Sequence, residues 1–369
     1  MLKTEIRKVL KGIERFYEAP QEDLAYFNLV YATPDVLCIS RKKDEEKYAY
    51  ILATGERLQK EKEIKRINAL AIPPAWQKVK IASLANAHLQ ATGRDGKNRK
   101  QYRYHPKWTT IRNQTKFYRM LPFAGVLPKI RKRVEADLTA KGWQKEKVLA
   151  LIVRLLEESH IRIGNSYYAE RNKTYGLSTL RNKHVSIFND KIKFQFIGKK
   201  GKEHKVTIKN KKLARLVNRC EELPGWELFQ YFDENGNKQK VDSGLVNQYL
   251  QECSGAHFTA KDFRTWAASL IVFDTLNTMP TVNSDKEKHK QWLLALDAAA
   301  KELNNTRKVC QQYYVHPLIE ELHKSEELTP YFKIANSRSK TNNTSLQPNE
   351  VALHQLLENY KPEILQKLK

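Results

Sequence analysis

The spacing of apolar residues divides the chain into a first part rich in short strands and a longer part rich in helices. Between about residues 28 and 82, the runs NLVYAT, VLCIS and YAYILATG have the composition of strands, and the charged segment RKKDEEK joins the last two. A short helix is expected at about 61–69, before the Pro73-Pro74 breaker. We therefore predict a small β-rich N-terminal domain over residues 1–114.

Helical patterns dominate the chain after this first domain. The stretch from Glu146 to Glu158 is apolar on most of its faces, which predicts a buried helix. The segments VSIF, KIKFQFIG and HKVTIK predict the three strands of a small antiparallel sheet. Further helices are expected at about 211–222, 243–253, 260–277 and 285–303. We therefore expect an α+β fold in which a mainly α-helical domain spans residues 115–335.

One of these helices has a well-specified start. Thr259 and Asp262 have the spacing of a capping box, and Phe258 and Phe263 have the spacing of a hydrophobic staple. The helix therefore begins at residue 260, and Arg264 lies in its second turn on a rigid element.

The last part of the chain differs in composition from the rest. Residues from Asn336 to Pro348 are rich in Ser, Asn and Thr, which is typical of a flexible linker. An amphipathic pattern then predicts a short helix at about 349–359. We therefore treat 336–369 as a tail made of a linker and a short C-terminal helix.

Composition and charge indicate what kind of partner the protein has. Hydrophobic residues make up 41% of the 369 residues, so the chain is globular rather than disordered. Its formal net charge of +25 points to a polyanion. An acidic membrane surface is the alternative, but the sequence has no run of apolar residues long enough to span a membrane. The first residues also lack a signal-peptide core, which predicts a cytoplasmic protein.

No cofactor is expected from the motifs in the sequence. The four cysteines are scattered and form no CxxC pair, so neither a metal site nor a disulfide framework is indicated. A glycine-rich phosphate loop is also missing, which argues against the use of ATP. The cysteines are Cys38, Cys220, Cys253 and Cys310.

The most basic stretch of the chain lies between Arg94 and Arg119. It holds nine Lys or Arg residues against a single acid, Asp95. Aromatic rings such as Tyr102 and Tyr104 are interleaved with these charges, a mixture that suits phosphate contacts together with stacking. The alternative is a solvated basic face with ordinary core aromatics.

A second group of residues could break a phosphodiester bond. Such a reaction needs fixed cationic donors for the nonbridging oxygens, a proton for the leaving oxygen and a nucleophile in line with it. Arginine suits the first task, a lysine with a lowered pKa the second and tyrosine the third. Taken singly, each candidate also has a purely structural explanation. An arginine can form a salt bridge, a lysine can be solvated at the surface, and a tyrosine can be a packing residue. The candidates are Arg162, Lys199, Arg264, Asn305 and Tyr314.

Seven motifs in order along the chain carry a family resemblance. They are LAIPPAW at 70–76, HLQATGRDGKNRKQYRYHPKW at 88–108, HIRIGN at 160–165, YGLSTLRNKHV at 175–185, FIGKKGKEH at 196–204, FTAKDFRTW at 258–266 and CQQYYVHP at 310–317. From about residue 28 to about residue 320, the chain resembles type IB DNA topoisomerases of the bacterial and poxvirus-like kind.

The resemblance implies a role for each candidate. Tyr314 corresponds to the nucleophile that forms a 3′-phosphotyrosyl link and expels a 5′-hydroxyl. Arg162 and Arg264 correspond to the clamp on the nonbridging oxygens, and Lys199 corresponds to the general acid. Asn305 stands where many relatives carry histidine, and its uncharged amide can still donate a hydrogen bond to a phosphate oxygen.

Two further details bear on this resemblance. Tyr313 is a competing nucleophile, but the family's tyrosine immediately precedes the Val-His-Pro run, which favours Tyr314. Lys261 stands three positions before Arg264, where the related tyrosine recombinases usually have histidine. Gln101, Tyr102 and Tyr104 match family positions that face DNA. The expected DNA-binding set is Lys100, Gln101, Tyr102, Arg103, Tyr104 and Lys261.

The function implied by the resemblance is the relaxation of positive and negative supercoils by transient cleavage of one strand, without ATP or metal. We expect double-stranded DNA as the partner, a monomer as the working form and a nucleoid-associated location. A tyrosine site-specific recombinase is one alternative, against which the β-rich first domain and the KDFR sequence argue. A non-catalytic DNA-binding protein is the other, and retention of the whole residue set argues against it.

Overall fold

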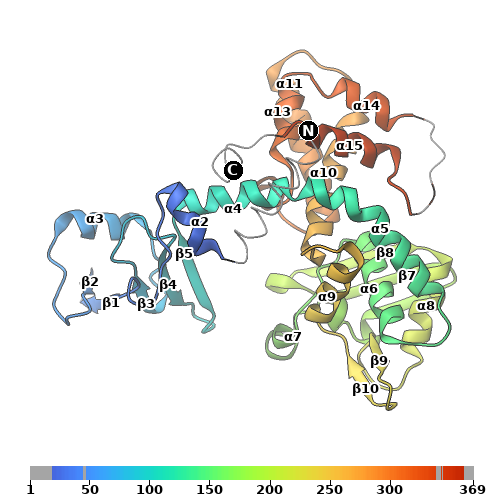
Figure 1. Cartoon of the computed structure of the whole chain (residues 1–369), viewed down its shortest axis with the longest axis horizontal. Helices are drawn as coiled ribbons and strands as arrows, with labels where there is room; N and C mark the ends of the chain where they lie inside the picture. The colour runs from blue at the N-terminus through green and yellow to red at the C-terminus, as the bar shows by residue number, and fades with distance from the viewer. Residues whose placement is uncertain (1–18, 45–46, 338–341, 343, 361–369) are drawn as a thin grey trace. The chain divides into compact units, whose positions relative to one another are not determined.

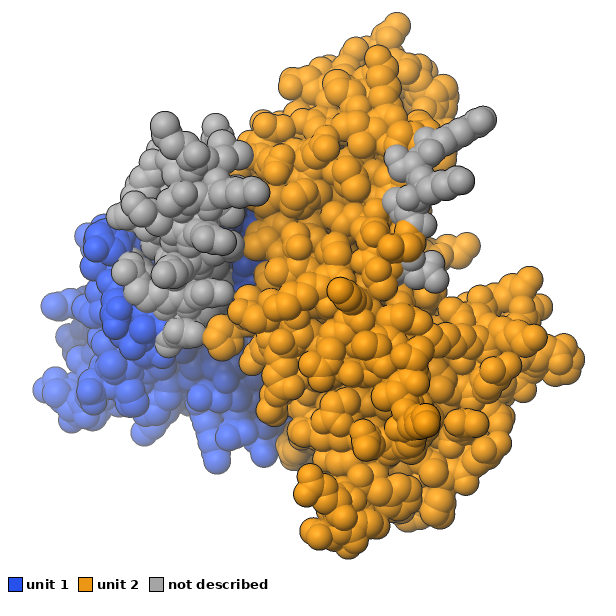
Figure 2. All heavy atoms as spheres, turned by 45° about the vertical axis from the view of Figure 1, so that its right-hand side comes forward, with its two compact units in different colours: residues 1–119, 361–369 blue, residues 120–360 orange. Residues whose placement is uncertain are grey.

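The protein folds into two compact units that meet in sequence at the end of one helix. The computed structural model describes residues 19–44, 47–337, 342 and 344–360. Unit 1 comprises Met1–Arg119 with Lys361–Lys369, and unit 2 comprises Met120–Tyr360 (Figure 2). The division lies five residues beyond the predicted end of the first domain (119 − 114 = 5), because the helix α4 (Pro106–Tyr118) continues unbroken past residue 114.

Unit 1 is built on an antiparallel sheet of five strands in the order β2-β1-β3-β4-β5 (Figure 1). The strands are β1 (Ile39–Asp44), β2 (Lys47–Ile51), β3 (Gln77–Ile81), β4 (Leu89–Arg94) and β5 (Lys100–Tyr104). Among the residues of unit 1 that the structure describes, the helices besides α4 are α2 (Pro20–Asp23), the 3-10 helix η1 (Leu24–Phe27) and α3 (Glu61–Ala69). The expected helix at 61–69 and the β-rich character of this part of the chain are therefore confirmed.

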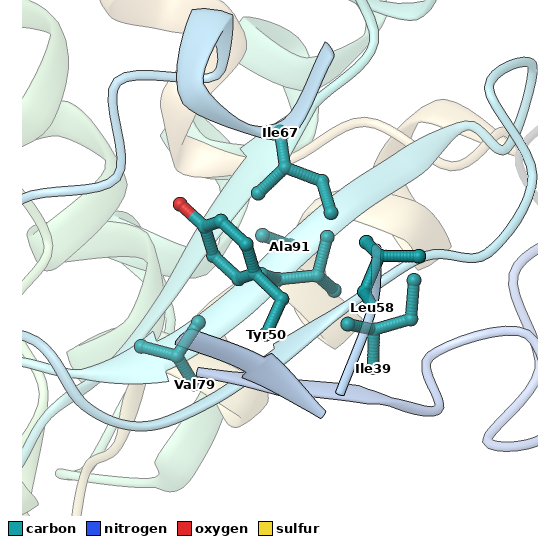
Figure 3. Packing of buried hydrophobic residues seen from close by; sticks show 7 residues of the cluster. Ile39, Tyr50, Leu58, Ile67, Val79 and Ala91 are labelled. Carbon is teal, nitrogen blue, oxygen red and sulfur yellow. The ribbon is translucent and has the colours of Figure 1, made fainter. Parts of the chain in front are cut away.

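The core of unit 1 lies between α3 and one face of the sheet (Figure 3). Ile67 of α3 packs there with residues from four different strands and with Leu58. The strand residues of this cluster are Ile39, Tyr50, Val79, Ile81 and Ala91. The removal of these apolar side chains from water is what holds the helix on the sheet.

Two details of the predicted strands in unit 1 were wrong. NLVYAT does not form a strand, because Asn28 has a φ of +54° and Val30 makes only an isolated bridge to Ala87. The charged segment RKKDEEK is not a connection outside the strands. Its residues Arg41 to Asp44 extend β1, and Lys47 begins β2. Charged side chains are tolerated there because β1 becomes exposed toward its end.

Unit 2 is mainly helical. Its helices are α5 (Met120–Thr139), α6 (Lys145–Ser159), α7 (Ser166–Asn172), α8 (Lys211–Glu221), α9 (Ser243–Ser254), α10 (Ala260–Asn277), α11 (Asp285–Glu302), α12 (Arg307–Tyr313), α13 (Pro317–Lys324), α14 (Thr329–Ala335) and α15 (Pro348–Glu358). Its strands are β6 (Val185–Phe188), β7 (Lys191–Ile197), β8 (Glu203–Lys209), β9 (Gln230–Phe232) and β10 (Lys238–Lys240). Three 3-10 helices complete it, η2 (Leu177–Thr179), η3 (Asn182–His184) and η4 (Lys199–Gly201). Within the described part of the chain, no helix is both long enough and apolar enough to cross a membrane.

Helix α6 lies at the centre of unit 2. Most of its side chains are buried, and it contacts α5, α9, α10 and strand β8 (Figure 1). The three-stranded antiparallel sheet β6-β7-β8 has the strands that the sequence predicts. Burial alternates strictly along β7, as expected for a strand with one covered face. The predicted α+β fold, with its buried helix and small sheet, is confirmed.

The start of α10 follows the sequence signals closely. The Asp262 carboxylate accepts hydrogen bonds from the Thr259 backbone N–H at 2.8 Å and from its hydroxyl at 2.9 Å. Phe258 and Phe263 are both buried, and both pack edge-on against the ring of Phe123. The helix therefore begins where the capping box and the staple require.

The C-terminal helix α15 is part of unit 2 and is attached by a buried ion pair. The guanidinium of Arg131 donates two hydrogen bonds, each 2.8 Å long, to the two carboxylate oxygens of Glu350. Trp266 of α10 donates a third to Glu350 at 3.1 Å. Of the predicted flexible linker at 336–348, residues 338–341 and 343 lie outside the described residues. The predicted helix at 349–359 is confirmed.

We predict that Glu350→Gln lowers the free energy of unfolding of unit 2 by about 3 kcal/mol at pH 7, because it leaves a buried arginine short of its charge partner. Burial alone would raise the pKa of Glu350, but the hydrogen bond and charge of Arg131 lower it overall. The stabilisation is therefore complete above the ordinary glutamate pKa and is lost as the pH falls through the lowered pKa. Urea unfolding followed by tryptophan fluorescence, at pH 7 and at lower pH, measures the difference.

The matched control is Asp297→Asn, which breaks an ion pair with Arg307 that is exposed on both sides. Exposed pairs add little to stability, so this change should leave the unfolding curve nearly unmoved. Equal effects of the two substitutions would contradict the role assigned to the Arg131–Glu350 pair.

Candidate active site

Arg162 lies on a segment whose backbone is held against a second segment. The backbone N–H of Leu177 donates to the carbonyl of Arg162 at 2.8 Å. Gly176 lies so close to this segment that a Cβ built on it would stand 2.5 Å from the Arg162 carbonyl oxygen. The same Cβ would stand 2.5 Å from the Cα of Gly164, which has a φ of +97°. HIRIGN and YGLSTL therefore pack backbone to backbone, and this contact fixes Arg162.

Arg264 is buried in the second turn of α10, and its guanidinium donates to the ends of two other helices. One terminal nitrogen donates to the carbonyl of His160, just after α6, and the other donates to the carbonyl of Leu303, just after α11, at 3.0 Å. The Arg264 Nε has no hydrogen-bond partner among the described residues. Burial, with the charge of Arg162 second, lowers the pKa of Arg264 to about 10, so the group is still a cation at neutral pH.

Asn305 follows α11 and contacts Arg162 directly. Arg162 Nη2 donates to the Asn305 Oδ1 at 2.5 Å, across 143 positions of sequence. The Asn305 Nδ2 is buried, its side chain acts on the pKa of the nearby Cys310 thiol, and it donates no hydrogen bond of good geometry to the residues that the structure describes. Because Arg162 occupies the amide oxygen, the amide nitrogen is left as a donor for another oxygen.

Tyr314 is half-buried at the end of α12, beside both arginines. The guanidinium carbon of Arg264 lies 5.4 Å from the centre of its ring. Burial alone would raise the pKa of Tyr314, but the charges of Arg264 and Arg162 contribute to an overall lowering of this pKa below its ordinary value. A hydrogen bond from Arg264 and the charge of Lys261 add to this. The neighbouring Tyr313, by contrast, is 42% exposed.

Ser269 of α10 holds the chain on either side of Val315. Its hydroxyl donates to the carbonyl of Tyr314 at 3.2 Å and accepts from the backbone N–H of His316 at 2.9 Å. His316 is fully buried, and its Nδ1 accepts from the N–H of Leu318 at the start of α13. The Val-His-Pro run therefore anchors the backbone directly after Tyr314.

Lys199 is exposed at the tip of the hairpin that joins β7 to β8. Among the side chains that the structure describes, Lys199 has no hydrogen bond or ring contact with Tyr314, Arg162 or Arg264. The base of the hairpin is nevertheless close to them. Burial, reinforced first by Arg162 and then by Arg264, lowers the pKa of His204 to about 4.

The structure therefore brings Arg162, Arg264, Asn305 and Tyr314 together and leaves Lys199 on an adjacent hairpin. Lys261 is exposed in the first turn of α10, near enough for its charge to act on Tyr314. Within the described ranges of the chain, no group of three His, Cys, Asp or Glu side chains has an arrangement that could hold a metal ion.

The remaining candidates lie on β5, the edge strand of the sheet in unit 1. Tyr102 and Tyr104 are 45% and 38% exposed, and their rings stack with centres 5.9 Å apart. The ammonium of Lys100 lies 5.5 Å from the centre of the Tyr102 ring. These three residues share one face of the strand, because side chains two apart point the same way. That face presents an exposed row of one cation and two rings.

Gln101 and Arg103 lie on the opposite face of β5 and make contacts within unit 1. Gln101 Nε2 donates to the Asp95 carboxylate at 2.9 Å. Arg103 Nη2 donates to the carbonyl of Ala71, just after α3, at 2.7 Å. The two groups of predicted DNA-binding residues in β5 therefore have different surroundings.

Sequence reasoning missed several residues that support the site. Ser269 is one, and its signal is only its position on α10, five residues after Arg264. His204 is another, although it stands within the motif FIGKKGKEH. His160 is a third, and its left-handed conformation, with a φ of +53°, ends α6 and turns the chain toward Arg162. A left-handed histidine leaves no signal in the sequence.

Comparison with known protein families identifies the class of this molecule. Residues 105–338, more than half of the chain, match the model described as eukaryotic DNA topoisomerase I, catalytic core. Residues 47–95 match the model described as bacterial DNA topoisomerase IB, N-terminal domain. The two matches cover a DNA topoisomerase core and its N-terminal domain.

Individual relatives agree with these two matches. The chain is 35% identical over 284 residues to DNA topoisomerase 1B of Acanthamoeba polyphaga mimivirus, which covers 75% of this chain and 84% of the relative. It is 22% identical over 244 residues to DNA topoisomerase 1B of Vaccinia virus (strain Copenhagen), covering 66% and 74%. It is 27% identical over 216 residues to DNA topoisomerase 1 of Mycosarcoma maydis, covering 53% and 20%. The chain therefore belongs to the type IB DNA topoisomerase family, as its motifs predict.

We predict that Gly176→Ala strongly destabilises unit 2, because the new Cβ would overlap backbone atoms of Arg162 and Gly164 that cannot move aside cheaply. The melting temperature should fall by several degrees. Differential scanning calorimetry measures the shift, and circular dichroism at low temperature checks that the variant still folds.

Gly125→Ala in α5 is the matched control, because a Cβ built there meets nothing within 4 Å. It should raise the melting temperature slightly, since alanine is favoured over glycine inside a helix by roughly 1 kcal/mol. A Gly176→Ala variant as stable as Gly125→Ala would show that the close approach around Arg162 is wrong.

Proposed function

We propose that the protein relaxes positively and negatively supercoiled DNA by cutting and resealing one strand through a covalent bond to Tyr314. The observation that supports this most directly is the position of the Tyr314 ring, whose centre lies 5.4 Å from the guanidinium carbon of Arg264, in surroundings whose charges lower its pKa against the effect of burial. A phenol in such surroundings loses its proton more readily than an ordinary tyrosine. Membership of the type IB topoisomerase family supports the same chemistry.

In the cleavage step, the Tyr314 phenol loses its proton and its oxygen attacks a backbone phosphorus. A bond forms between this oxygen and phosphorus, and the bond from phosphorus to the 5′ oxygen breaks. The 5′ oxygen takes a proton and leaves as a hydroxyl, so the tyrosine carries the 3′ phosphate. Resealing is the reverse reaction, in which the 5′-hydroxyl attacks phosphorus and Tyr314 regains its proton.

We assign the developing charge on the nonbridging oxygens to three donors. Arg162 and Arg264 supply fixed positive charge, and Asn305 supplies a neutral N–H from an amide nitrogen that has no protein partner among the described residues. Preorganised donors of this kind act on charge that develops in the transition state, and loss of one typically slows a reaction by about 100- to 1000-fold.

We assign the protonation of the leaving 5′ oxygen to Lys199. Lys199 lies at the exposed tip of the hairpin whose residue His204 is close enough to Arg162 and Arg264 for their charges to lower its pKa, which supports this assignment. A proton donor has to come within hydrogen-bonding distance of the leaving oxygen, and such contacts often form only when substrate is bound.

We propose that neither ATP nor a metal cofactor takes part. The phosphotyrosine bond conserves the free energy of the phosphodiester that was cut, and the torsional stress of the DNA supplies the driving force. Arg162 and Arg264 carry out the charge stabilisation that a metal ion would otherwise provide.

The proposed partner is double-stranded DNA, which a net charge of +25 would attract. The exposed row of Lys100, Tyr102 and Tyr104 is suited to phosphate and base contacts, and Lys261 lies beside Tyr314. We include Gln101 and Arg103 in the DNA surface as well. One copy of the chain would suffice, and the working location would be the nucleoid in the cytoplasm.

The test of the nucleophile is Tyr314→Phe, which removes only the phenolic oxygen. We expect complete loss of plasmid relaxation, assayed on both supercoil signs in EDTA without nucleotide. The covalent protein–DNA adduct trapped by denaturant should disappear as well.

Tyr313→Phe is the control, since Tyr313 is the neighbouring tyrosine and is 42% exposed. It should keep both relaxation and the adduct. If Tyr313→Phe were inactive and Tyr314→Phe active, the assignment of the nucleophile would be wrong. If both variants relaxed plasmid, the covalent mechanism would be wrong.

We predict that Lys100→Ala weakens duplex binding to a similar extent on different sequences and reduces the salt dependence of log K by about 0.9, the value of one phosphate contact. Fluorescence anisotropy with two unrelated duplexes at several salt concentrations measures this slope. Lys65→Ala is the control, because Lys65 is exposed on α3, which covers the other face of the sheet. An unchanged slope for Lys100→Ala would remove this residue from the DNA surface.

A further inference from the structure

The hairpin that carries Lys199 is tied at its base to the loop that carries Asn305. We propose that Asn304, which forms this tie, is a positioning residue that holds the hairpin so that Lys199 can deliver its proton. The proposal rests on the proposed function and deepens it, because it concerns how the leaving oxygen is protonated rather than whether the strand is cut.

The tip of this hairpin makes few contacts of its own. Lys199, Lys200 and Gly201 are all exposed, and the last two have φ values of +65° and +73°. A tip of this kind moves more freely than the strands that support it. The position of the Lys199 ammonium therefore depends on the root of the hairpin, by which we mean Gly198 after β7 and Glu203 and His204 at the start of β8.

Asn304 holds one side of that root. Its side-chain Nδ2 donates to the backbone carbonyl of Glu203, the first residue of β8, at 2.8 Å. Its own backbone has a φ of +48°, a left-handed conformation that asparagine tolerates better than most residues. The next residue is Asn305, which accepts the hydrogen bond from Arg162. One side chain thus joins the hairpin to the residues that surround Tyr314.

His204, the next residue of β8, supports the neighbouring strand β7. It is buried, it pairs with Phe196 across the two strands, and the two rings stack with their centres 4.8 Å apart. Gly198 lies directly against it, since a Cβ built there would be 2.5 Å from the His204 Nε2. The residue just before Lys199 therefore lies directly against a buried ring.

These two contacts restrict where the tip can go. A general acid works only when its donor comes within about 3 Å of the leaving oxygen, so a small displacement of the hairpin reduces the fraction of productive complexes. Loss of the Asn304 bond should release Glu203, the first residue of β8, while the ring of His204 stays stacked on Phe196. The defect should then be confined to proton delivery.

Replacing the leaving 5′ oxygen of the DNA by sulfur distinguishes a defect in proton delivery from other defects in cleavage. A position at which the wild-type protein cleaves DNA is mapped first. Two duplexes with that sequence are then prepared, one with the normal 5′ oxygen at the cleavage position and one with sulfur in its place. A thiol is much more acidic than an alcohol, so a sulfur leaving group departs without a proton donor. Single-turnover cleavage of both duplexes is measured for each variant.

The variants are chosen so that the left-handed backbone at residue 304 is retained. Asn304→Gly removes the side chain but keeps the positive φ accessible, and Asn304→Asp keeps the shape but replaces the N–H donor by an acceptor. Gln291→Ala is the control, because its amide likewise donates an exposed hydrogen bond of 2.8 Å to a backbone carbonyl, that of Pro280, at the other end of α11. Lys199→Ala and Arg162→Ala serve as reference variants.

We expect Asn304→Gly and Asn304→Asp to slow cleavage of the oxygen duplex about fivefold, the effect of one neutral hydrogen bond, and to cleave the sulfur duplex at the wild-type rate. Lys199→Ala should be slowed much more on oxygen and should also recover on sulfur. Arg162→Ala should be slow on both duplexes, and Gln291→Ala should match the wild type on both.

Two results would overturn the proposal alone. One is an Asn304 variant that is slowed equally on oxygen and sulfur while Lys199→Ala recovers on sulfur, which would mean a structural role only. The other is an Asn304 variant that matches the wild type on oxygen. A Lys199→Ala variant that stays slow on sulfur would instead overturn the assignment of the general acid, and the positioning role with it.

Discussion

The positive charge of Arg264, buried without an acidic partner among the described residues, is the constraint on which the rest of unit 2 depends. Its guanidinium donates to two backbone carbonyls, those of His160 and Leu303, and no carboxylate neutralises it. Burying an ion in this way costs free energy, which its lowered pKa also reflects. The surrounding helices must supply that free energy through packing. As a result, they hold a positive charge beside the ring of Tyr314.

A second buried arginine in the same unit shows the contrasting arrangement. Arg131 is paired with both Glu350 and Glu157, and despite its burial these carboxylates raise its pKa. Its charge is fully used within the protein, where it attaches α15 to the helices α5 and α6. The comparison separates the two roles of a buried guanidinium. A guanidinium paired with carboxylates fixes structure, whereas one whose partners are uncharged keeps its full positive charge.

Local signals made part of this site predictable from the sequence. The capping box and the staple determine the start of α10, and with it the position of Arg264, because both depend on residues within five positions of each other. Strand pairing in unit 1 was less predictable, since Val30 has an apolar neighbourhood in sequence but only one bridge partner. The Arg162–Asn305 hydrogen bond joins residues 143 positions apart, and no local pattern encodes such a contact. Family motifs carried that information instead.

The choice between two adjacent tyrosines illustrates how long-range packing decides chemistry. Tyr313 is the last residue of α12, whereas Tyr314 has left the helix with a φ of −131°. That departure places its ring beside Arg264, whereas Tyr313 is more exposed. The turn is held by Ser269, which belongs to the same helix as Arg264 and grips the backbone on both sides of Val315. One helix therefore supplies both the cation and the clamp that brings the phenol to it, so the distance between them is fixed by helix geometry rather than by a flexible loop.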